Sequence, residues 1–417
     1  MLTRVDITPK AKIVPGYLSW GRSAVSLPIS EQDHSNIESL RDLEREFRAR
    51  SRLDSTAIDK NEWNSELLQE VYDYSYPLRN LLTAKTTVKL SPKWLMFWEI
   101  YTTCLTDNLI KRMQFRVENI RSRSKMRAVD RKIEYEEKGI SLRGVPLRSF
   151  HMYDNGGYSI PTIQKAINHV EFETGAQINW DWLAISLPNS TEVEKVEQRK
   201  NKEKWIPSVD GEASTTVANM RAWRNRILTN LKVVDVIVNN NEREDDKTND
   251  IAFVLLNLAA GGDAFITMPR ISSTAVASMI HLFTQCFEKS EIVHTLAMDR
   301  VLLCGNGFLN NLNAKHHKLI YEFCEQSPDS QDVSLFTSQY LDSEQFNETV
   351  DNLVAVNTLI HKWRYEYYDK LLTIYTKLYK SYATKTFENY IQQTLTEVYK
   401  DQSKKWVTFT KFNFFAE

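Results

Sequence analysis

Strand-like and helix-like segments alternate through the middle of this chain, and that alternation constrains the fold more than any other feature. Short apolar runs separated by amphipathic stretches favour a mostly parallel sheet with helices on both faces. Strands are predicted at 147–152, 182–187, 233–238, 264–268 and 301–304, the last one ending at Gly305. Helices are predicted between them at 160–170, 251–260 and 274–287. The expected fold class is therefore α/β.

Helical patterns flank this region on both sides. N-terminal helices are predicted at 35–52, 63–82 and 92–120, and residues 318–417 are predicted to be largely helical. The chain end around Trp406 is aromatic, so we expect it to dock on this chain or on a partner. Residues 1–30 are punctuated by proline and are consistent with an arm that orders only against a partner.

These patterns divide the chain into three regions. They are a 1–84 N-terminal arm with helices, an 85–312 α/β domain with a basic insertion at 111–148, and a 313–417 helical C-terminal region. The charged stretch at 192–205 is expected to be an exposed loop.

Composition excludes several classes of protein. The chain has 53 Lys and Arg against 54 Asp and Glu, and its 42% hydrophobic content supplies a core, which excludes a polycation and global disorder. Its four scattered cysteines argue for a reducing compartment, and no metal site is expected. The sequence shows neither a signal-peptide stretch nor a membrane-length apolar run. We therefore expect a chain that is not secreted and has no membrane span, in cytoplasm, nucleus or a virion.

The balanced total charge conceals one strongly basic segment. Residues 111–132 contain nine basic residues and two acidic ones. A solvated helix face and a phosphate-contacting surface both explain such a run, and the second makes RNA a candidate partner. The candidate RNA-binding residues are Arg112, Arg116, Arg121, Arg123, Lys125 and Arg127.

A glycine-containing turn follows the first predicted strand of the α/β region. In α/β sheets this turn binds nucleotide-like ligands, since glycine admits close backbone approach and the next helix offers free N–H groups. The candidate ligand-binding residues are Asp154, Asn155, Gly156 and Gly157. Two adjacent glycines are also explained by a tight turn alone.

Further short motifs lie in order around this turn. They are Trp94-Leu95-Met96-Phe97-Trp98-Glu99-Ile100, Asn168-His169, Trp180-Asp181-Trp182-Leu183-Ala184 and Gly261-Gly262-Asp263-Ala264-Phe265-Ile266-Thr267. Together they resemble FtsJ-like ribose 2′-O-methyltransferases, especially the cap-specific type that modifies the second transcribed nucleotide. The resemblance covers roughly residues 85–310. It implies a methyltransferase-like, Rossmann-type domain.

The resemblance also implies a catalytic Lys-Asp-Lys-Glu tetrad, which this chain lacks. The matching positions are Met96, Asn239 or Asn240, Thr267 and Arg300. None holds the expected ionisable type, and neither methionine nor threonine replaces an ammonium group. The resemblance therefore predicts an inactive member, possessing no cofactor, that serves as a scaffold or accessory subunit of a larger viral or RNA-processing assembly. Poxvirus cap methyltransferases offer a precedent, because one is also a polymerase-stimulating subunit.

The alternative is an active, S-adenosylmethionine-dependent mRNA cap 2′-O-methyltransferase with a rearranged site. Nearby ionisable groups would then carry the chemistry. The candidates are Lys93, Glu99, Asp235 and Asp299.

Overall fold

The computed structural model describes most of the α/β region and parts of its flanks. The described residues are 3–9, 12, 18–22, 42, 45–46, 49, 92–105, 145–154, 159–174, 178–186, 198–209, 214–241, 243, 247–269, 271, 273–295, 300–326, 333–341, 343–382, 397, 400–401, 404–408 and 410. The predicted helix at 63–82 and the basic segment at 111–132 lie outside them, and the predicted helix at 35–52 is represented by four helical positions.

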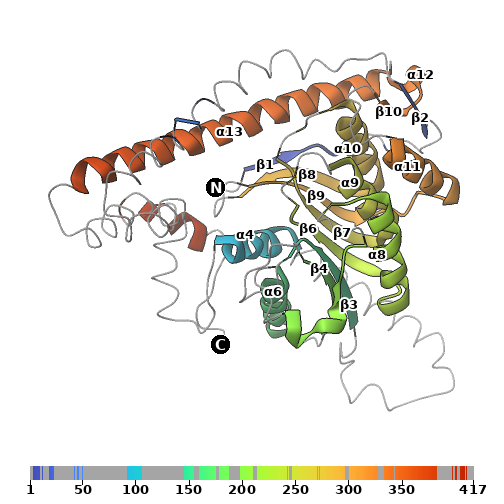
Figure 1. Cartoon of the computed structure of the whole chain (residues 1–417), viewed down its shortest axis with the longest axis horizontal. Coiled ribbons are helices and arrows are strands. Elements are labelled where there is room, and N and C mark those ends of the chain that lie inside the picture. The colour runs from blue at the N-terminus through green and yellow to red at the C-terminus, as the bar shows by residue number, and fades with distance from the viewer. Residues whose placement is uncertain are drawn as a thin grey trace.

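An eight-stranded sheet forms the centre of the molecule (Figure 1). In spatial order its strands are β1 (Thr3–Asp6), β8 (Phe287–His294), β9 (Val301–Phe308), β7 (Leu258–Thr267), β6 (Val234–Asn239), β3 (Val145–Met152), β4 (Ile178–Ile185) and β5 (Trp205–Ile206). The strands from β7 to β5 pair in parallel, whereas β9 runs antiparallel to both neighbours. Strand order reverses between β3 and β6, as in doubly wound folds. This mostly parallel sheet, in which β9 and β1 run opposite to the other strands, confirms the expected α/β class with helices on both faces.

Helices cover both faces of the sheet and create two apolar clusters. One face carries α8 (Val217–Asn230), α9 (Lys247–Asn257) and α10 (Thr274–Cys286), with α11 (Ala314–Gln326) packed outside them. The opposite face carries α4 (Pro92–Ile100), its continuation as the π-helix η1 (Tyr101–Leu105), and α6 (Ser159–Thr174). Every residue of α10 is buried, because the helix lies between the sheet and the C-terminal region.

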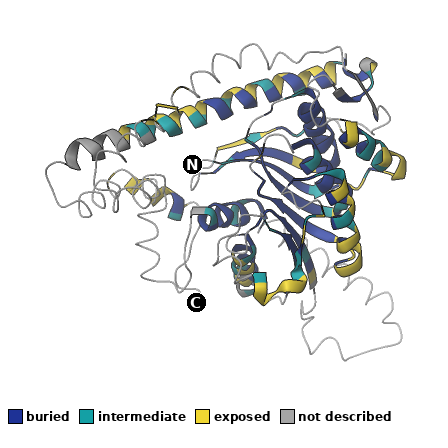
Figure 2. Ribbon diagram, viewed as in Figure 1, coloured by how far each residue is buried: buried dark blue, intermediate teal, exposed yellow. Residues whose placement is uncertain are grey.

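The C-terminal region is dominated by a single long helix, α13 (Glu344–Tyr382). Its first half packs on α10, and a buried stripe alternates with exposed residues along it (Figure 2). Two short elements precede it, α12 (Ser338–Leu341) and β10 (Val333–Phe336), which pairs with β2 (Leu18–Arg22). Farther along, Trp406 is 1% exposed and belongs to the apolar cluster of α4. The expected docking of the aromatic chain end therefore occurs on this chain at Trp406.

The N-terminal arm differs from its prediction. Residues 3–6 form β1, which pairs with β8 of the same chain and extends the sheet at its antiparallel end. Its order therefore requires no partner, and the expectation is wrong for these residues. A backbone hydrogen bond from Ile7 N to Ser290 O continues the attachment.

Four other sequence predictions also need correction. The helix predicted to reach Ala260 ends at Asn257, because Leu258 already pairs with Val234 in β7. The strand predicted at 264–268 begins earlier, at Leu258, and Gly261 has a positive φ at an irregularity within it. The predicted loop at 192–205 contains the 3₁₀ turn η2 (Lys202–Lys204) and the first residue of β5.

The last predicted strand is longer than expected and is not the last. Gly305 lies inside β9, where a Cβ atom would come within 2.5 Å of the Phe283 ring, and β10 follows later. Strand β8 and helix α8 had no counterpart in the sequence predictions. Within the described residues, no helix combines the length and apolar character needed to cross a membrane.

Candidate functional site at the carboxyl edge of the parallel strands

The carboxyl ends of β3, β4 and β6 meet where the strand order reverses. In open α/β sheets this is where ligands bind. Backbone hydrogen bonds join the three ends: Asp154 N donates to Ile185 O at 3.1 Å, and Asn240 N donates to Met152 O at 3.1 Å. The edge is therefore fixed by the sheet itself.

Asp154 is the candidate ligand-binding residue that the structure describes. It is 2% exposed, and its Oδ2 accepts a hydrogen bond from Ile160 N at 3.0 Å in the first turn of α6. A carboxylate at this position neutralises the partial positive charge of the helix N-terminus. Asn155, Gly156 and Gly157 lie outside the described residues. The Asp154 carboxylate therefore occupies the N-terminus of α6, where an anionic group of a ligand would otherwise bind.

A buried polar network lies behind this edge on the α9 side. Tyr153, with a positive φ of 60°, places its hydroxyl 2.7 Å from Thr215 Oγ1, which donates to Asp250 Oδ1 at 2.5 Å. Asp250 Oδ2 accepts from Lys247 Nζ at 3.0 Å and from Asn241 Nδ2 at 3.1 Å. The side chains of Lys247 and Asp250 are completely buried. This ion pair was not predicted from the sequence. The signal that could have found it is the spacing of three residues between Lys247 and Asp250, shortly after the end of β6.

Three of the four tetrad positions lie at neighbouring strand ends. Asn239 pairs with Ile266, so Asn240 and Thr267 lie at neighbouring strand ends. Met268 N donates to Val301 O at 2.7 Å, which brings Arg300 to the same edge.

Strand alternation fixes the face on which these three positions lie. Each is two residues beyond a member of the apolar cluster that contains Met96. Those cluster members are Val238, Phe265 and Leu302. These three positions therefore lie on one face near one edge, whereas Met96 is 1% exposed in the apolar core that α4 forms on that face.

The alternative ionisable groups are more scattered. Asp235 lies at the opposite end of β6 and accepts a hydrogen bond from Arg148 N at 2.9 Å. Glu99 is buried on α4 and Lys93 is half-buried at its start. Asp299 is outside the described residues. The structure therefore does not bring Asp235 to the edge that carries Asn240 and Thr267.

A second hydrogen-bonded chain spans this face. Trp180 Nε1 donates to Ser149 Oγ at 2.9 Å, and His151 bridges Ser149 and Ser159 with distances of 2.8 Å on both ring nitrogens. Ser159 Oγ lies 2.5 Å from the Tyr101 hydroxyl. Burial lowers the pKa of His151 to about 3, and it raises the pKa of Tyr101 above its usual range. The imidazole is therefore neutral at physiological pH and links β3 to α6.

The Trp180 indole only donates, so the Ser149 hydroxyl accepts its proton and can still donate or accept once more. The neutral imidazole of His151 donates through one ring nitrogen and accepts through the other, which joins Ser149 to Ser159. This network ties β4, β3, α6 and η1 together.

These residues fit S-adenosylmethionine poorly. Its ribose requires hydrogen-bond acceptors, yet the described carboxylates at the edge, Asp154 and Asp250, are already bonded to the protein. Asn239 Nδ2 is a buried donor that finds no acceptor. One spare donor does not make a ribose site, so no reaction step through this cofactor is derived. Among the described residues, no three His, Cys, Asp or Glu side chains gather as a metal site would require.

Comparisons with known proteins give little further identification. No protein-family model matches the chain, and no curated protein matches it. Among solved structures, it is similar to the crystal structure of MNMC2 from Aquifex aeolicus, with a TM-score of 0.27 and 11% identity. That alignment covers 53% of this chain and 70% of the other.

Proposed function

We propose that this chain is a catalytically degenerate cap 2′-O-methyltransferase-like protein that acts as a scaffold or accessory subunit of a larger assembly. The observation that carries the proposal is that Asn240, Thr267 and Arg300 lie at neighbouring strand ends, while Met96 is buried in the apolar cluster on the same face. Their side chains include no general base, because a thioether, an amide and a hydroxyl do not titrate near neutrality and arginine stays protonated.

The elements outside the sheet support the scaffold role. Helix α13 continues for 39 residues, and Trp406 fixes the chain end to the cluster around α4. Such additions enlarge the surface without contributing to the candidate site. Proteins bind partners through surfaces of this kind, and fold alone does not imply catalysis.

Ligand binding and methyl transfer test this proposal together. We expect titration calorimetry with S-adenosylmethionine to give no micromolar binding, and labelled-methyl transfer to capped RNA to stay at background, because Asp154 and Asp250 at this edge already bond to the protein. Micromolar binding that is lost in Asp154→Asn would contradict the scaffold role. Methyl transfer that is lost in Lys93→Met or Glu99→Gln would instead establish the active alternative with its rearranged site.

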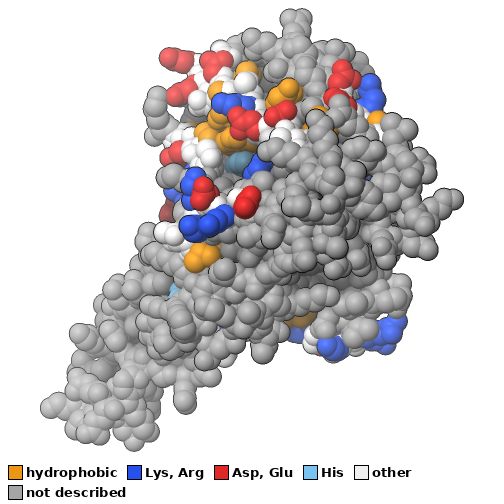
Figure 3. All heavy atoms as spheres, turned by 90° about the vertical axis from the view of Figure 1, so that its left-hand side faces the viewer, with side chains coloured by type: hydrophobic (Ala, Val, Ile, Leu, Met, Phe, Trp, Pro, Cys, Tyr) orange, Lys and Arg blue, Asp and Glu red, His pale blue; other side chains and the backbone are white. Residues whose placement is uncertain are grey.

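RNA is the second partner that we propose, and the basic segment at 111–132 supports it. On the described surface, the upper part of the face in Figure 3 carries charges of both signs side by side. We expect single-stranded RNA to bind, with affinity falling about 10²- to 10³-fold between 50 and 200 mM salt if about six phosphates are neutralised.

Charge-reversal variants test whether RNA binds to the basic segment at 111–132. Replacing Arg121, Arg123 and Arg127 with glutamate is expected to abolish the fluorescence anisotropy signal of labelled RNA. The matched control reverses three basic residues on exposed helix positions, Arg226, Lys318 and Lys362, and should bind normally. Equal losses in both triple variants, or binding insensitive to salt, would remove the proposal.

A further inference from the structure

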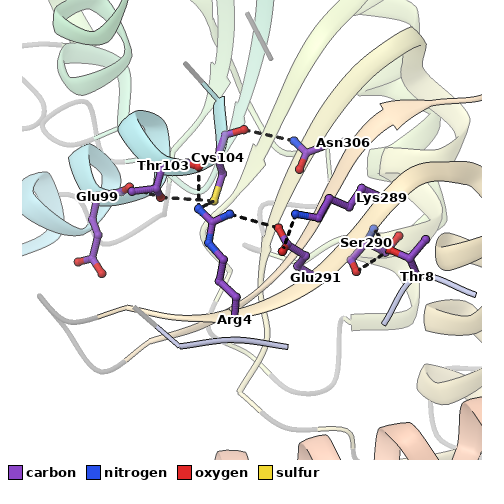
Figure 4. A network of polar contacts seen from close by, with 9 residues as sticks. All are labelled: Arg4, Thr8, Glu99, Thr103, Cys104, Lys289, Ser290, Glu291 and Asn306. Carbon is purple, nitrogen blue, oxygen red and sulfur yellow. Dashed lines mark hydrogen bonds and ion pairs between the residues drawn. The ribbon is translucent and has the colours of Figure 1, made fainter. Parts of the chain in front are cut away.

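Two cysteines meet at the antiparallel end of the sheet, away from the candidate site. Cys104 belongs to the π-helix η1, and Cys304 lies in the middle of β9. Both are buried and reduced, and both belong to the apolar cluster on the α4 face. The Asn306 side chain donates to Cys104 O at 3.4 Å, which holds η1 against β9 (Figure 4).

Arg4 of β1 covers the sulfur of Cys104. Its Nη2 lies 3.4 Å from Cys104 Sγ and donates to Thr103 O at 2.6 Å. Its Nη1 lies 3.5 Å from Glu291 Oε2, so the guanidinium bridges a carboxylate and a sulfur (Figure 4). The Thr103 hydroxyl adds a contact at 3.5 Å. A cation and two hydrogen-bonding groups around one sulfur are the surroundings typical of reactive cysteines.

Cys304 is positioned as the partner thiol. It stands directly opposite Glu291 in the antiparallel β8–β9 pair, so both side chains lie on the face that η1 covers. The Cys304 and Cys104 thiols each shift the proton affinity of the other, so the two side chains are near one another in the reduced protein. Cys286 and Cys324 lie in the other apolar cluster.

We propose that Cys104 and Cys304 form a peroxide-reactive thiol pair, in which Cys104 is oxidised first and Cys304 then closes a disulfide between η1 and β9. Cys104 is 5% exposed beneath an Arg4 side chain that is 31% exposed, so a small oxidant has a short path to the sulfur. The reducing compartment indicated by the cysteine pattern is where reversible disulfides of this kind act as sensors.

The proton affinities support this division of roles. The Cys304 hydrogen bond lowers the pKa of Cys104, and the Arg4 charge and the Thr103 hydroxyl lower it further. Burial and the Glu291 charge raise this pKa, but the lowering effects are larger in sum. The same hydrogen bond, together with burial, raises the pKa of Cys304 well above its usual value. Burial raises the pKa of the Cys286 thiol to about 12, which leaves that residue unreactive.

The oxidation balances with hydrogen peroxide as the oxidant. The Cys104 thiolate attacks one peroxide oxygen, so an S–O bond forms, the O–O bond breaks, and the departing hydroxide takes a proton from solvent as water. The Cys304 sulfur then attacks the Cys104 sulfenic sulfur, forming the S–S bond, while its thiol proton leaves with the hydroxyl as a second water. Two thiols lose two electrons in total, and the peroxide is reduced to two waters.

Peroxide treatment of the full-length chain tests the pair. After alkylation under denaturing conditions, mass spectrometry should find Cys104 and Cys304 in one disulfide-linked peptide. Cys286 and Cys324 should remain alkylated as the internal controls, with Cys104 lost at least tenfold faster than Cys286. Equal loss of all four thiols, or a disulfide joining any other two cysteines, overturns the proposal.

Variants separate the two roles. Cys304→Ser should accumulate a Cys104 sulfenic acid that dimedone traps, and Cys104→Ser should slow the loss of Cys304 at least tenfold. In the wild type, Arg4 raises the thiolate fraction of Cys104 by more than it lowers the nucleophilicity of that thiolate. Arg4→Met should therefore slow Cys104 oxidation about fivefold. Arg4→Lys keeps the cation and should react nearly as wild type. If Arg4→Met leaves the rate unchanged while the far-ultraviolet circular dichroism stays native, the activating role of Arg4 is wrong.

Discussion

Replacing Lys247 with methionine is expected to lower the free energy of unfolding by about 3–5 kcal/mol, because the Asp250 carboxylate is left buried without its cation. Lys247 Nζ donates to Asp250 Oδ2 at 3.0 Å and to Asn241 O at 2.5 Å, and neither side chain of the ion pair is exposed. The remaining partners of Asp250, Thr215 and Asn241, are neutral and cannot compensate its charge. Urea unfolding followed by circular dichroism measures the change.

The chain supplies a matched control for this substitution. Lys318 forms an ion pair with Glu322 one helical turn away at 3.6 Å, and its side chain is 79% exposed. Lys318→Met should therefore change the free energy of unfolding by at most about 1 kcal/mol. If Lys247→Met and Lys318→Met lower the free energy of unfolding equally, the burial of the Lys247–Asp250 pair does not increase its contribution to stability.

The parallel half of the sheet was predictable because its strands are buried on both faces. Such strands appear as continuous apolar runs, and residues 233–238 predicted β6 to within one residue at each end. Strand β8 escaped prediction because Glu288, Lys289 and Glu291 interrupt its apolar pattern. The structure accommodates Glu291 by ion pairs with Arg4 and Lys289, and one of those partners is 287 positions away. No local pattern carries that information.

Chain segments that depend on distant partners were also mispredicted. Strand β5 has two residues and follows an exposed, charged stretch, so only its pairing with β4 and the contact of Trp205 with Trp182 identify it. Strand β1 orders on β8 of the same chain, whereas the sequence predicted an arm that orders only against a partner. In both cases tertiary pairing overrides weak local preference.

For the candidate site, the resemblance assigned Asn239 or Asn240, Thr267 and Arg300 to tetrad positions. The sheet register brings Asn240, Thr267 and Arg300 to one edge, and their chemical roles stay a prediction. The Tyr153–Thr215–Asp250 network was not predicted, because its members are 62 and 35 positions apart. Hydrogen bonds between residues so far apart in sequence form only when the chain folds. They show that these polar residues bond to one another within the protein.

Replacing Trp406 with alanine is expected to release the chain end from α4. Truncating a fully buried tryptophan costs about 3–5 kcal/mol, which corresponds to at least about 100-fold more frequent local opening. Limited proteolysis with mass mapping should therefore show cleavage near 404–408 at least about 100-fold faster than in wild type, if opening limits cleavage. Lys405→Ala changes an exposed neighbour on the same helical turn and should leave the cleavage rate within about twofold, as expected for a surface substitution. Equal cleavage of both variants would show that Trp406 does not fix the chain end.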